Sequence, residues 1–247
     1  MPHYVRYDEL PSTNTLMKQQ APTLPHATVI YTPKQTAGRG QKGNTWHAQP
    51  GMNATFSMLL KRLDIRATQQ FVINEAVTLA IVDALAAWLP DGLAVKWPND
   101  IYHGDSKLCG LLIEHSLDGA MIDYSVVGIG INVNQREWGN NAPNPTSLAL
   151  ITGQQANADE VMQRVCDAIE ATCHAGLDSA MLHERYLSRL YRNDGNNHPW
   201  RLPDGTQFDA SIAGVAPDGT LTLRHADGTL HDYAFQQVKH IINNNTL

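Results

Sequence analysis

Hydrophobic and polar positions along the chain predict alternating helices and strands up to about residue 193. Helical patterns cover residues 12–20, 69–89, 159–175 and 179–192, and the second has apolar side chains at every third or fourth position. Ser12 is a favourable capping residue for the first helix. Short runs with strand composition predict six strands, at residues 4–7, 27–31, 53–60, 94–102, 108–115 and 124–133. Residues 32–52 predict a long loop.

The pattern changes near Asp194. Beyond this point, short β-like runs are separated by three Asp-Gly pairs, at 204–205, 218–219 and 227–228. An Asp-Gly pair between alternating runs is a strong signal for a β-hairpin. We therefore predict two domains, residues 1–193 and residues 194–247, of which the second is a small β-barrel or sandwich.

Composition narrows the class of protein without indicating a reaction. The 247 residues are 43% hydrophobic, which is enough for a packed core in one or two domains. The N-terminal residues lack a continuous apolar segment, and Asp83 interrupts the most apolar later one, so neither secretion nor a membrane span is predicted. Cys109, Cys166 and Cys173 form no C-x-x-C pair, which favours reduced thiols and a cytoplasmic location.

Charge is distributed unevenly. The chain carries a formal net charge of -6, yet residues 10–63 contain no Asp or Glu. All 24 acidic residues lie outside this window, which holds Lys18, Lys34, Arg39, Lys42, Lys61 and Arg62. A local anionic ligand explains this asymmetry, and a solvated basic face is the alternative. Nucleic-acid binding is disfavoured, because the sequence pI is about 6.0.

A glycine-rich run lies inside the basic window. Gly38, Gly40 and Gly43 have the spacing G-x-G-x-x-G, but a dinucleotide site needs a helix directly after them. Pro50 and Gly51 exclude that helix, and the chain lacks the Gly-Lys-Ser/Thr run of a P-loop. The run therefore predicts a loop whose backbone can approach a ligand closely and whose cations can pair with carboxylate or phosphate.

A second cluster, Lys96-Trp97-Pro98-Asn99-Asp100, supplies a cation and a carboxylate within one short turn. Such a pair suits a phosphate and Mg²⁺, although Pro-Asn-Asp is also frequent in ordinary turns. Lys107 precedes an apolar run and would point to the same cavity if its strand neighbours the previous one. A solvated lysine before a strand is the alternative for that residue.

Five blocks, taken together and in order, resemble biotin protein ligases. They are Ser12-Thr13-Asn14, then residues 35–43 (Gln-Thr-Ala-Gly-Arg-Gly-Gln-Lys-Gly) with Trp46, then residues 96–100, Lys107-Leu108-Cys109-Gly110, and Gly128-Ile129-Gly130-Ile131-Asn132. The resemblance spans nearly the whole chain. It implies an α+β fold, in which a mixed sheet flanked by helices, related to class II aminoacyl-tRNA synthetases and lipoate ligases, precedes a small SH3-like β-barrel.

The resemblance also implies a two-step reaction. Biotin and ATP, with Mg²⁺, would give biotinyl-5′-AMP and pyrophosphate, and a lysine of a biotin carboxyl carrier protein or domain would then take the biotinyl group. The acceptor would belong to acetyl-CoA carboxylase or a related biotin enzyme, and the ligase would be a monomer or homodimer. Bifunctional relatives carry a DNA-binding domain ahead of the first block. Because eleven residues precede Ser12, we expect no DNA binding.

The same resemblance assigns roles to individual residues. Biotin would be bound by Ser12, Thr13, Asn14, Gln35, Gly38, Arg39, Gly40, Gln41, Trp46, Lys107 and Gly110. The nucleotide would be bound by Arg39, Lys42, Lys96, Asn99 and Asn132. The catalytic groups would be Arg39, Lys96, Asp100 and Lys107, with Asp100 also binding Mg²⁺. Gln41 and Asn44 stand where some relatives have arginine, so retention of the adenylate is expected to differ.

Two other functions fit the same motifs less well. A lipoate or octanoate ligase of the same superfamily would share the sheet and the lysine, but it normally lacks the glycine-arginine loop joined to residues 96–100. A non-catalytic biotin-binding paralogue would have no need for phosphate and metal groups such as Lys96 and Asp100.

Overall fold

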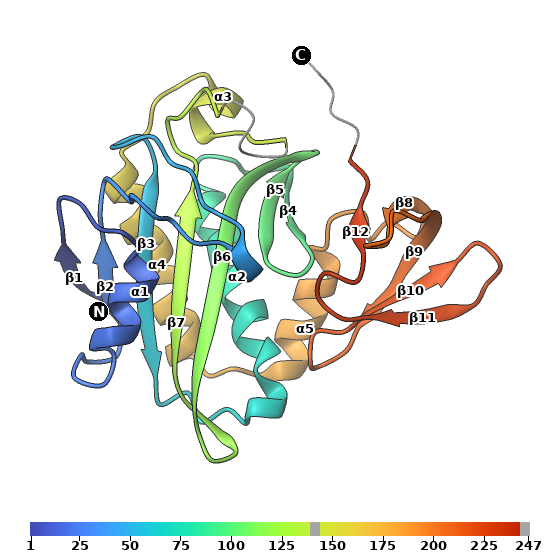
Figure 1. The fold of residues 1–247 in the computed structure, drawn as a ribbon, viewed down its shortest axis with the longest axis horizontal. Helices are drawn as coiled ribbons and strands as arrows, with labels where there is room; N and C mark the ends of the chain where they lie inside the picture. The colour runs from blue at the N-terminus through green and yellow to red at the C-terminus, as the bar shows by residue number, and fades with distance from the viewer. Residues whose placement is uncertain (139–143, 243–247) are drawn as a thin grey trace.

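The computed structural model describes residues 1–138 and 144–242, which form two β-sheets and a layer of helices (Figure 1). The larger sheet has the strand order β1-β2-β3-β7-β6-β5-β4. Only β1 and β2 pair in parallel, so the sheet is mixed and the predicted α+β class is confirmed. Its strands are β1 (His3–Arg6), β2 (Thr28–Tyr31), β3 (Ala54–Lys61), β4 (Leu93–Lys96), β5 (Asp100–His103), β6 (Ser106–Asp118) and β7 (Met121–Ile131).

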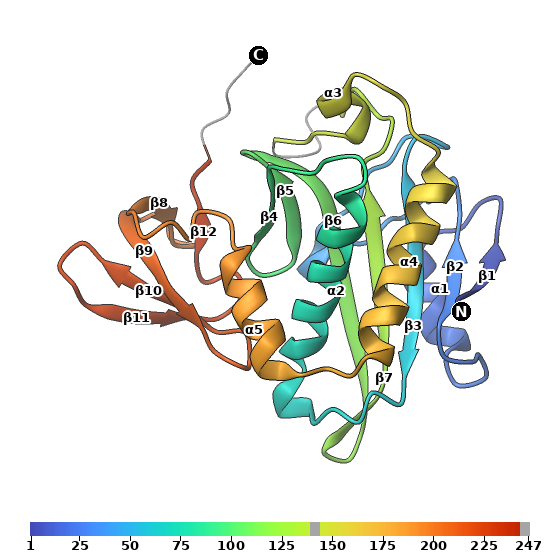
Figure 2. The same ribbon diagram turned by 180° about the vertical axis from the view of Figure 1, so that it is seen from behind.

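Helices cover the two faces of this sheet unequally. One face carries the packed helices α2 (Phe71–Leu85), α4 (Ala158–His174) and α5 (Ser179–Ser188), which Figure 2 shows in front of the strands. The opposite face carries only α1 (Thr13–Gln20) and the loop that contains the 3-10 turn Gln41–Gly43. A short helix, α3 (Leu148–Thr152), follows β7. The second face is therefore open to a ligand over much of its area.

The main hydrophobic core lies between the sheet and the three large helices. Thirteen of the fifteen residues of α2 are buried, because this helix packs against the strands and against both α4 and α5. A smaller cluster fixes α1 to the other face, with Met17 of the helix packed against Ile30, Leu59 and Val126 of three strands. Ser12 caps α1, as predicted, by accepting a hydrogen bond from the Thr15 amide at 3.4 Å.

Several predicted elements differ from the observed ones, among them the helix predicted at 179–192, which ends at Ser188. The single strand predicted at residues 94–102 is two strands, β4 and β5, joined by a tight turn at residues 97–99. Pro98 has no amide hydrogen to donate to a strand ladder, which explains the break. The strand predicted at 108–115 is longer and forms a hairpin with β7. The helix predicted at 69–89 is shorter and spans Phe71–Leu85, since Gln69 belongs to the preceding 3-10 turn Ala67–Gln69 and the helix ends four residues before position 89.

The C-terminal residues form a separate five-stranded antiparallel sheet. Its strands are β8 (His198–Arg201), β9 (Gln207–Val215), β10 (Leu221–His225), β11 (Leu230–Tyr233) and β12 (Lys239–His240). Each predicted Asp-Gly pair joins two of them, with the glycine at φ near +90° and the aspartate accepting a backbone N–H two residues later. The strand order β11-β10-β9-β8-β12 is open among the described residues. A domain division between residues 193 and 194 stays a proposal.

Aromatic contacts join the two sheets. Trp97, in the turn between β4 and β5, donates from its indole Nε1 to the Gly219 carbonyl oxygen at 2.9 Å. Its ring meets Phe235 edge to face, with 5.4 Å between centroids, and Phe235 also packs on Phe71 of α2. The C-terminal sheet is thus held against the β4–β5 end of the larger sheet (Figure 1).

No helix between residues 1 and 138 or between 144 and 242 combines the length and apolar character needed to cross a bilayer.

A buried Glu–His hydrogen bond between α2 and α5 predicts a pH-dependent stability. Glu75 is 3% exposed and lies 2.7 Å from His183 Nδ1, and burial raises its pKa despite the opposing effect of His183. Because the folded-state pKa is raised, stability falls as pH rises above the unfolded value of about 4.3. The stability of the variant Glu75→Gln relative to the unaltered chain should therefore rise as the pH is raised above about 4.3, as measured by urea unfolding at a series of pH values. A stability difference that does not change with pH would contradict this account.

Candidate active site

A cavity of about 490 Å³ opens on the face of the large sheet that carries α1, and residues of the C-terminal sheet close one side of it. Thirteen of the residues selected from the sequence line this cavity. They are Ser12, Thr13, Asn14, Gln35, Arg39, Gly40, Gln41, Trp46, Lys96, Asn99, Asp100, Lys107 and Gly110. Blocks almost 100 residues apart in sequence therefore meet at one place.

Three other selected residues are placed differently. Gly38 lies just outside the lining, where a Cβ would come within 2.3 Å of the Trp46 carbonyl oxygen. Asn132 is buried behind Lys107, to whose carbonyl oxygen it donates at 3.4 Å. The side chain of Lys42 lies outside the described part of the structure.

Glycines form the floor of the cavity. A Cβ at Gly130 would lie 2.2 Å from the Trp46 indole, and one at Gly110 would lie 2.9 Å from it. At Gly128 a Cβ would lie 2.1 Å from Asn14 Oδ1. Only glycine allows Trp46 and Asn14 to lie this close to β6 and β7. Gly128 and Gly130 were not selected as site residues, although their spacing of two places them on one face of a strand.

One end of the cavity is uncharged and rich in hydrogen-bonding groups. We call Ser12, Thr13 and Gln35 the polar end. The Thr13 amide donates to Gln35 Oε1 at 2.8 Å, and the Thr13 hydroxyl lies 3.2 Å from the same oxygen. Ser12 and Thr13 are buried at the start of α1, where the helix cap holds the Ser12 hydroxyl and contacts with Gln35 and Ser57 hold the Thr13 hydroxyl.

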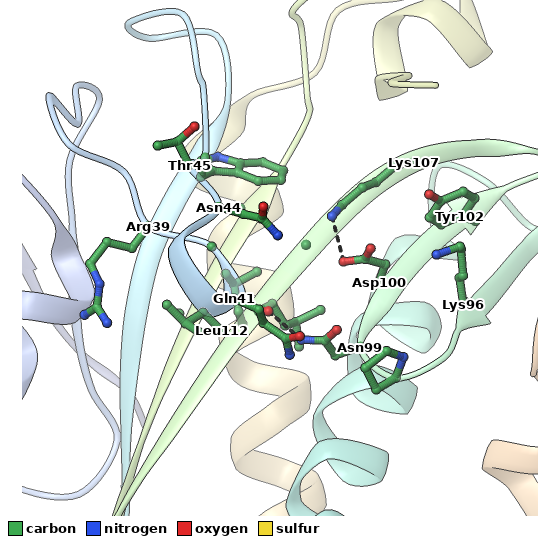
Figure 3. A pocket seen from close by; sticks show the side chains of 18 of the residues that line it. Arg39, Gln41, Asn44, Thr45, Lys96, Asn99, Asp100, Tyr102, Lys107 and Leu112 are labelled. Carbon is green, nitrogen blue, oxygen red and sulfur yellow. Dashed lines mark hydrogen bonds and ion pairs between the residues drawn. The ribbon is translucent and has the colours of Figure 1, made fainter. Parts of the chain in front are cut away.

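The other end carries cations and one carboxylate. We call Lys96, Lys107 and Asp100 the cationic end, and Figure 3 shows the three side chains converging from β4, β5 and β6. Lys107 Nζ lies 2.7 Å from Asp100 Oδ1. Lys96 lies over the ring of Tyr102, 5.3 Å from its centroid. Burial lowers the pKa of Lys96, while the Asp100 carboxylate acts to raise it. An anion placed here would favour the charged form of Lys96.

Arg39 is directed away from the cavity (Figure 3). Its guanidinium binds both oxygens of Glu114, at 3.1 and 3.2 Å, and Lys18 binds the same carboxylate at 2.9 Å. Glu114 was not predicted from the sequence. It follows Gly110 and Leu112 on the same face of β6, and this period of two is the signal that could have identified it.

The C-terminal sheet contributes a wall that the sequence did not predict. Trp200, Lys239 and His240 line the cavity near Lys96. The His240 ring stacks on Trp200, with 3.6 Å between centroids, and neither ring nitrogen has a partner among the described residues. Burial, together with the nearby Lys96 and Arg192, lowers the pKa of His240 to about 2. No local pattern places residue 240 beside residue 96, so sequence reasoning missed this contact.

Comparison with known proteins identifies the class of enzyme. A model of the biotin/lipoate A/B protein ligase family matches residues 7–132, about half of the chain. The chain is 28% identical over 244 residues to the bifunctional ligase/repressor BirA of Bacillus subtilis, covering 94% of this chain and 72% of that protein. It is 29% identical over 225 residues to the biotin-[acetyl-CoA-carboxylase] ligase of Paracoccus denitrificans, covering 88% and 92% of the two chains.

A solved structure shows the same fold. The biotin protein ligase from Aquifex aeolicus, determined in complex with biotin and ATP, superposes with a TM-score of 0.79 at 23% identity, covering 98% of this chain and 100% of that one. Fold, cavity and sequence similarity together define an enzyme of the ligase class, as the motifs predicted. The chain belongs to the biotin/lipoate A/B protein ligase family.

The glycine floor makes a direct prediction. Gly130→Ala should push the Trp46 indole off β7, because the added Cβ would overlap it, and should cost about 1–3 kcal/mol of stability. Urea unfolding measures the loss, and acrylamide quenching of tryptophan fluorescence reports the displaced ring. The matched control is Gly214→Ala, on β9, where a Cβ meets open space and the change should stay within about 0.5 kcal/mol. Equal effects in the two variants would contradict the proposed contact.

Proposed function

We propose that this ligase activates biotin with ATP as biotinyl-5′-AMP and transfers the biotinyl group to a lysine of a biotin carboxyl carrier protein or domain. The observation that carries the proposal is the polarity of the cavity, which joins an uncharged polar end to a cationic end. Biotin has the same division, since an uncharged ureido ring lies opposite a carboxylate. The similarity to biotin ligases of known name supports the assignment.

The polar end suits the ureido ring. Buried N–H and C=O groups need partners, and Ser12, Thr13 and Gln35 offer hydroxyl and amide groups to them. Trp46 and the glycine floor would enclose the apolar part of biotin. The dithiolane ring of lipoate has no N–H or C=O groups, so it would leave these polar side chains without partners. This difference favours biotin over lipoate or octanoate.

The cationic end suits adenylation. The biotin carboxylate must attack the α-phosphorus of ATP, so two anions must approach and the bond to pyrophosphate must break. Lys107 would bind the carboxylate and then the adenylate, and Lys96 would bind phosphate oxygens. Cations held in place in a partly buried site stabilise such a transition state strongly. Arg39 would join them by leaving Glu114, with Lys18 remaining on that carboxylate. Asn99, Asn132 and Lys42 stay proposed contacts of the nucleotide.

Mg²⁺ fits the site as an ion that arrives with the nucleotide. Asp100 is a carboxylate of the cavity lining, and no cluster of three or more His, Cys, Asp or Glu side chains suited to a metal occurs in the described part of the chain. A site with one carboxylate and substrate phosphates is typical of Mg²⁺. When bound, the ion would neutralise charge on the phosphates. Asp100 would hold it, and would then release Lys107 from their ion pair.

The second step would transfer the biotinyl group. The neutral ε-amine of a carrier lysine attacks the acyl carbon of the mixed anhydride, an amide forms, and AMP leaves as the C–O bond breaks. The Paracoccus relative is named for acetyl-CoA carboxylase, which supports a carrier domain as the acceptor.

The first test is ATP–pyrophosphate exchange by the purified chain with Mg²⁺, with biotin, lipoate or octanoate supplied separately. We expect exchange with biotin. Lys107→Ala should lower the rate by at least about 100-fold, because it removes a charge that stabilises the transition state. Lys34→Ala is the control, since Lys34 belongs to the same basic window but pairs with Glu9 outside the cavity. Exchange with lipoate or octanoate alone would contradict the biotin assignment.

Asp100→Asn tests the metal role. The substitution removes one Mg²⁺ ligand, so the Mg²⁺ concentration that gives half-maximal exchange should rise by about tenfold or more. Biotin affinity, measured by calorimetry without nucleotide, should not fall, because Lys107 loses a competing partner. An unchanged Mg²⁺ dependence would assign Asp100 to holding Lys107 alone.

A further inference from the structure

The side-chain amide of Asn14 has a single possible orientation. Its Nδ2 faces the Leu112 carbonyl oxygen at 3.1 Å and Glu114 Oε2 at 3.2 Å. Both partners can only accept hydrogen bonds when Glu114 is ionised, so the nitrogen must face them and Oδ1 must face the other way. Asn14 Oδ1 then lies against Gly128 of β7 and accepts a hydrogen bond from the Ser57 hydroxyl.

This orientation determines where the next two protons lie. Ser57 Oγ has one proton and faces both Asn14 Oδ1 and Thr13 Oγ1. Because Asn14 Oδ1 can only accept, the Ser57 proton is committed to it. Thr13 must then donate its own proton to Ser57 Oγ, at 2.8 Å, or to Gln35 Oε1, at 3.2 Å. In either case the proton of Thr13 points into the wall, and a lone pair is left for the cavity.

Gln35 is oriented from the same side. Its Oε1 accepts from the Thr13 amide at 2.8 Å, so its Nε2 is the end left to donate to a ligand. The polar end therefore presents an acceptor at Thr13 and a donor at Gln35. A ureido ring needs that arrangement, since it offers two N–H donors and one carbonyl acceptor.

Building on the proposed function, we infer that Glu114 is a positioning residue that orients the Thr13 hydroxyl and so fixes the acceptor of the polar end. It does not line the cavity and acts through Asn14, Ser57 and Thr13. Arg39 and Lys18 hold the carboxylate in place from the glycine loop and from α1. Although burial acts to raise the pKa of Glu114, the hydrogen bonds from Lys18, Arg39 and Asn14 outweigh it and lower that pKa. The carboxylate thus remains an acceptor at neutral pH.

The test compares two neutral ligands that differ at one ring position of the head group. Biotin has a ureido N–H where its cyclic-carbamate analogue has a ring oxygen, so the acceptor at Thr13 favours biotin. Calorimetry on the full chain gives the ratio of the two dissociation constants. In Glu114→Gln the two cations attract the new amide oxygen, which turns the amide nitrogen toward Asn14. The Asn14 amide then keeps the Leu112 carbonyl oxygen as an acceptor but faces a donor at residue 114, so its orientation is weakened. We expect the preference for biotin to shrink by about tenfold, the size of one mispaired buried hydrogen bond. Loss of Arg39 orientation would weaken both ligands equally and leave the ratio unchanged.

Two further variants separate positioning from folding. Ser57→Ala removes the hydroxyl in the middle of the Glu114–Asn14–Ser57–Thr13 series, outside the cavity lining. It should also reduce the preference for biotin. Lys18→Met is the matched control, because it removes a cation from Glu114 and keeps the Asn14 contact, so its ratio should equal that of the unaltered chain. Urea unfolding verifies that each variant is folded at the temperature of the titration.

The outcomes distinguish the inference from the function on which it rests. If the unaltered chain does not bind biotin, the proposed function is wrong and the inference fails with it. If the unaltered chain binds and prefers biotin, and Glu114→Gln and Ser57→Ala show the same ratio of the two dissociation constants, only the inference is overturned. If Glu114→Gln does not fold, the ratio in Ser57→Ala decides.

Discussion

The antiparallel pairing of β6 with β7 is the interaction on which the rest of the structure depends. On one face of β7, Val127, Ile129 and Ile131 enter the main core beneath the large helices. On the other face, Gly128 and Gly130 leave room for Asn14 and Trp46. A single strand therefore supplies apolar burial to one layer and free volume to the other, because successive side chains of a strand point to opposite faces. The cavity therefore lies over the face of β7 where glycines alternate with the core residues and leave space free of side chains.

Much of the fold and of the candidate site could be predicted from local pattern. Helix α1 was located by its cap at Ser12, and the C-terminal hairpins by their Asp-Gly pairs, since both signals depend on residues a few positions apart. The residues selected for the cavity were found as ordered motifs rather than by geometry. Their convergence needs the pairing of β3, β7 and β6, which brings residues 12–14 next to residues 110–114.

Most of the features that escaped prediction depend on distant parts of the chain. The local mark of Glu114 is only its place two residues after Leu112 on the face of β6 that carries Gly110, and its partners lie 75 to 100 residues away. His240 enters the cavity wall only because the C-terminal sheet packs against the β4–β5 turn. The split of residues 94–102 into two strands had a local cause in Pro98, but strand composition on both sides concealed it.

The indole of Trp97 connects the C-terminal sheet to the part of the large sheet that carries the charged groups of the cavity. Its neighbours Lys96 and Asp100 contribute charge to the cationic end, while its own Nε1 holds the Gly219 turn of the other sheet. A small rotation of the C-terminal sheet would therefore displace residues 96–100, which include Lys96 and Asp100. The position of the outer sheet and the position of these charged groups are therefore linked through one side chain.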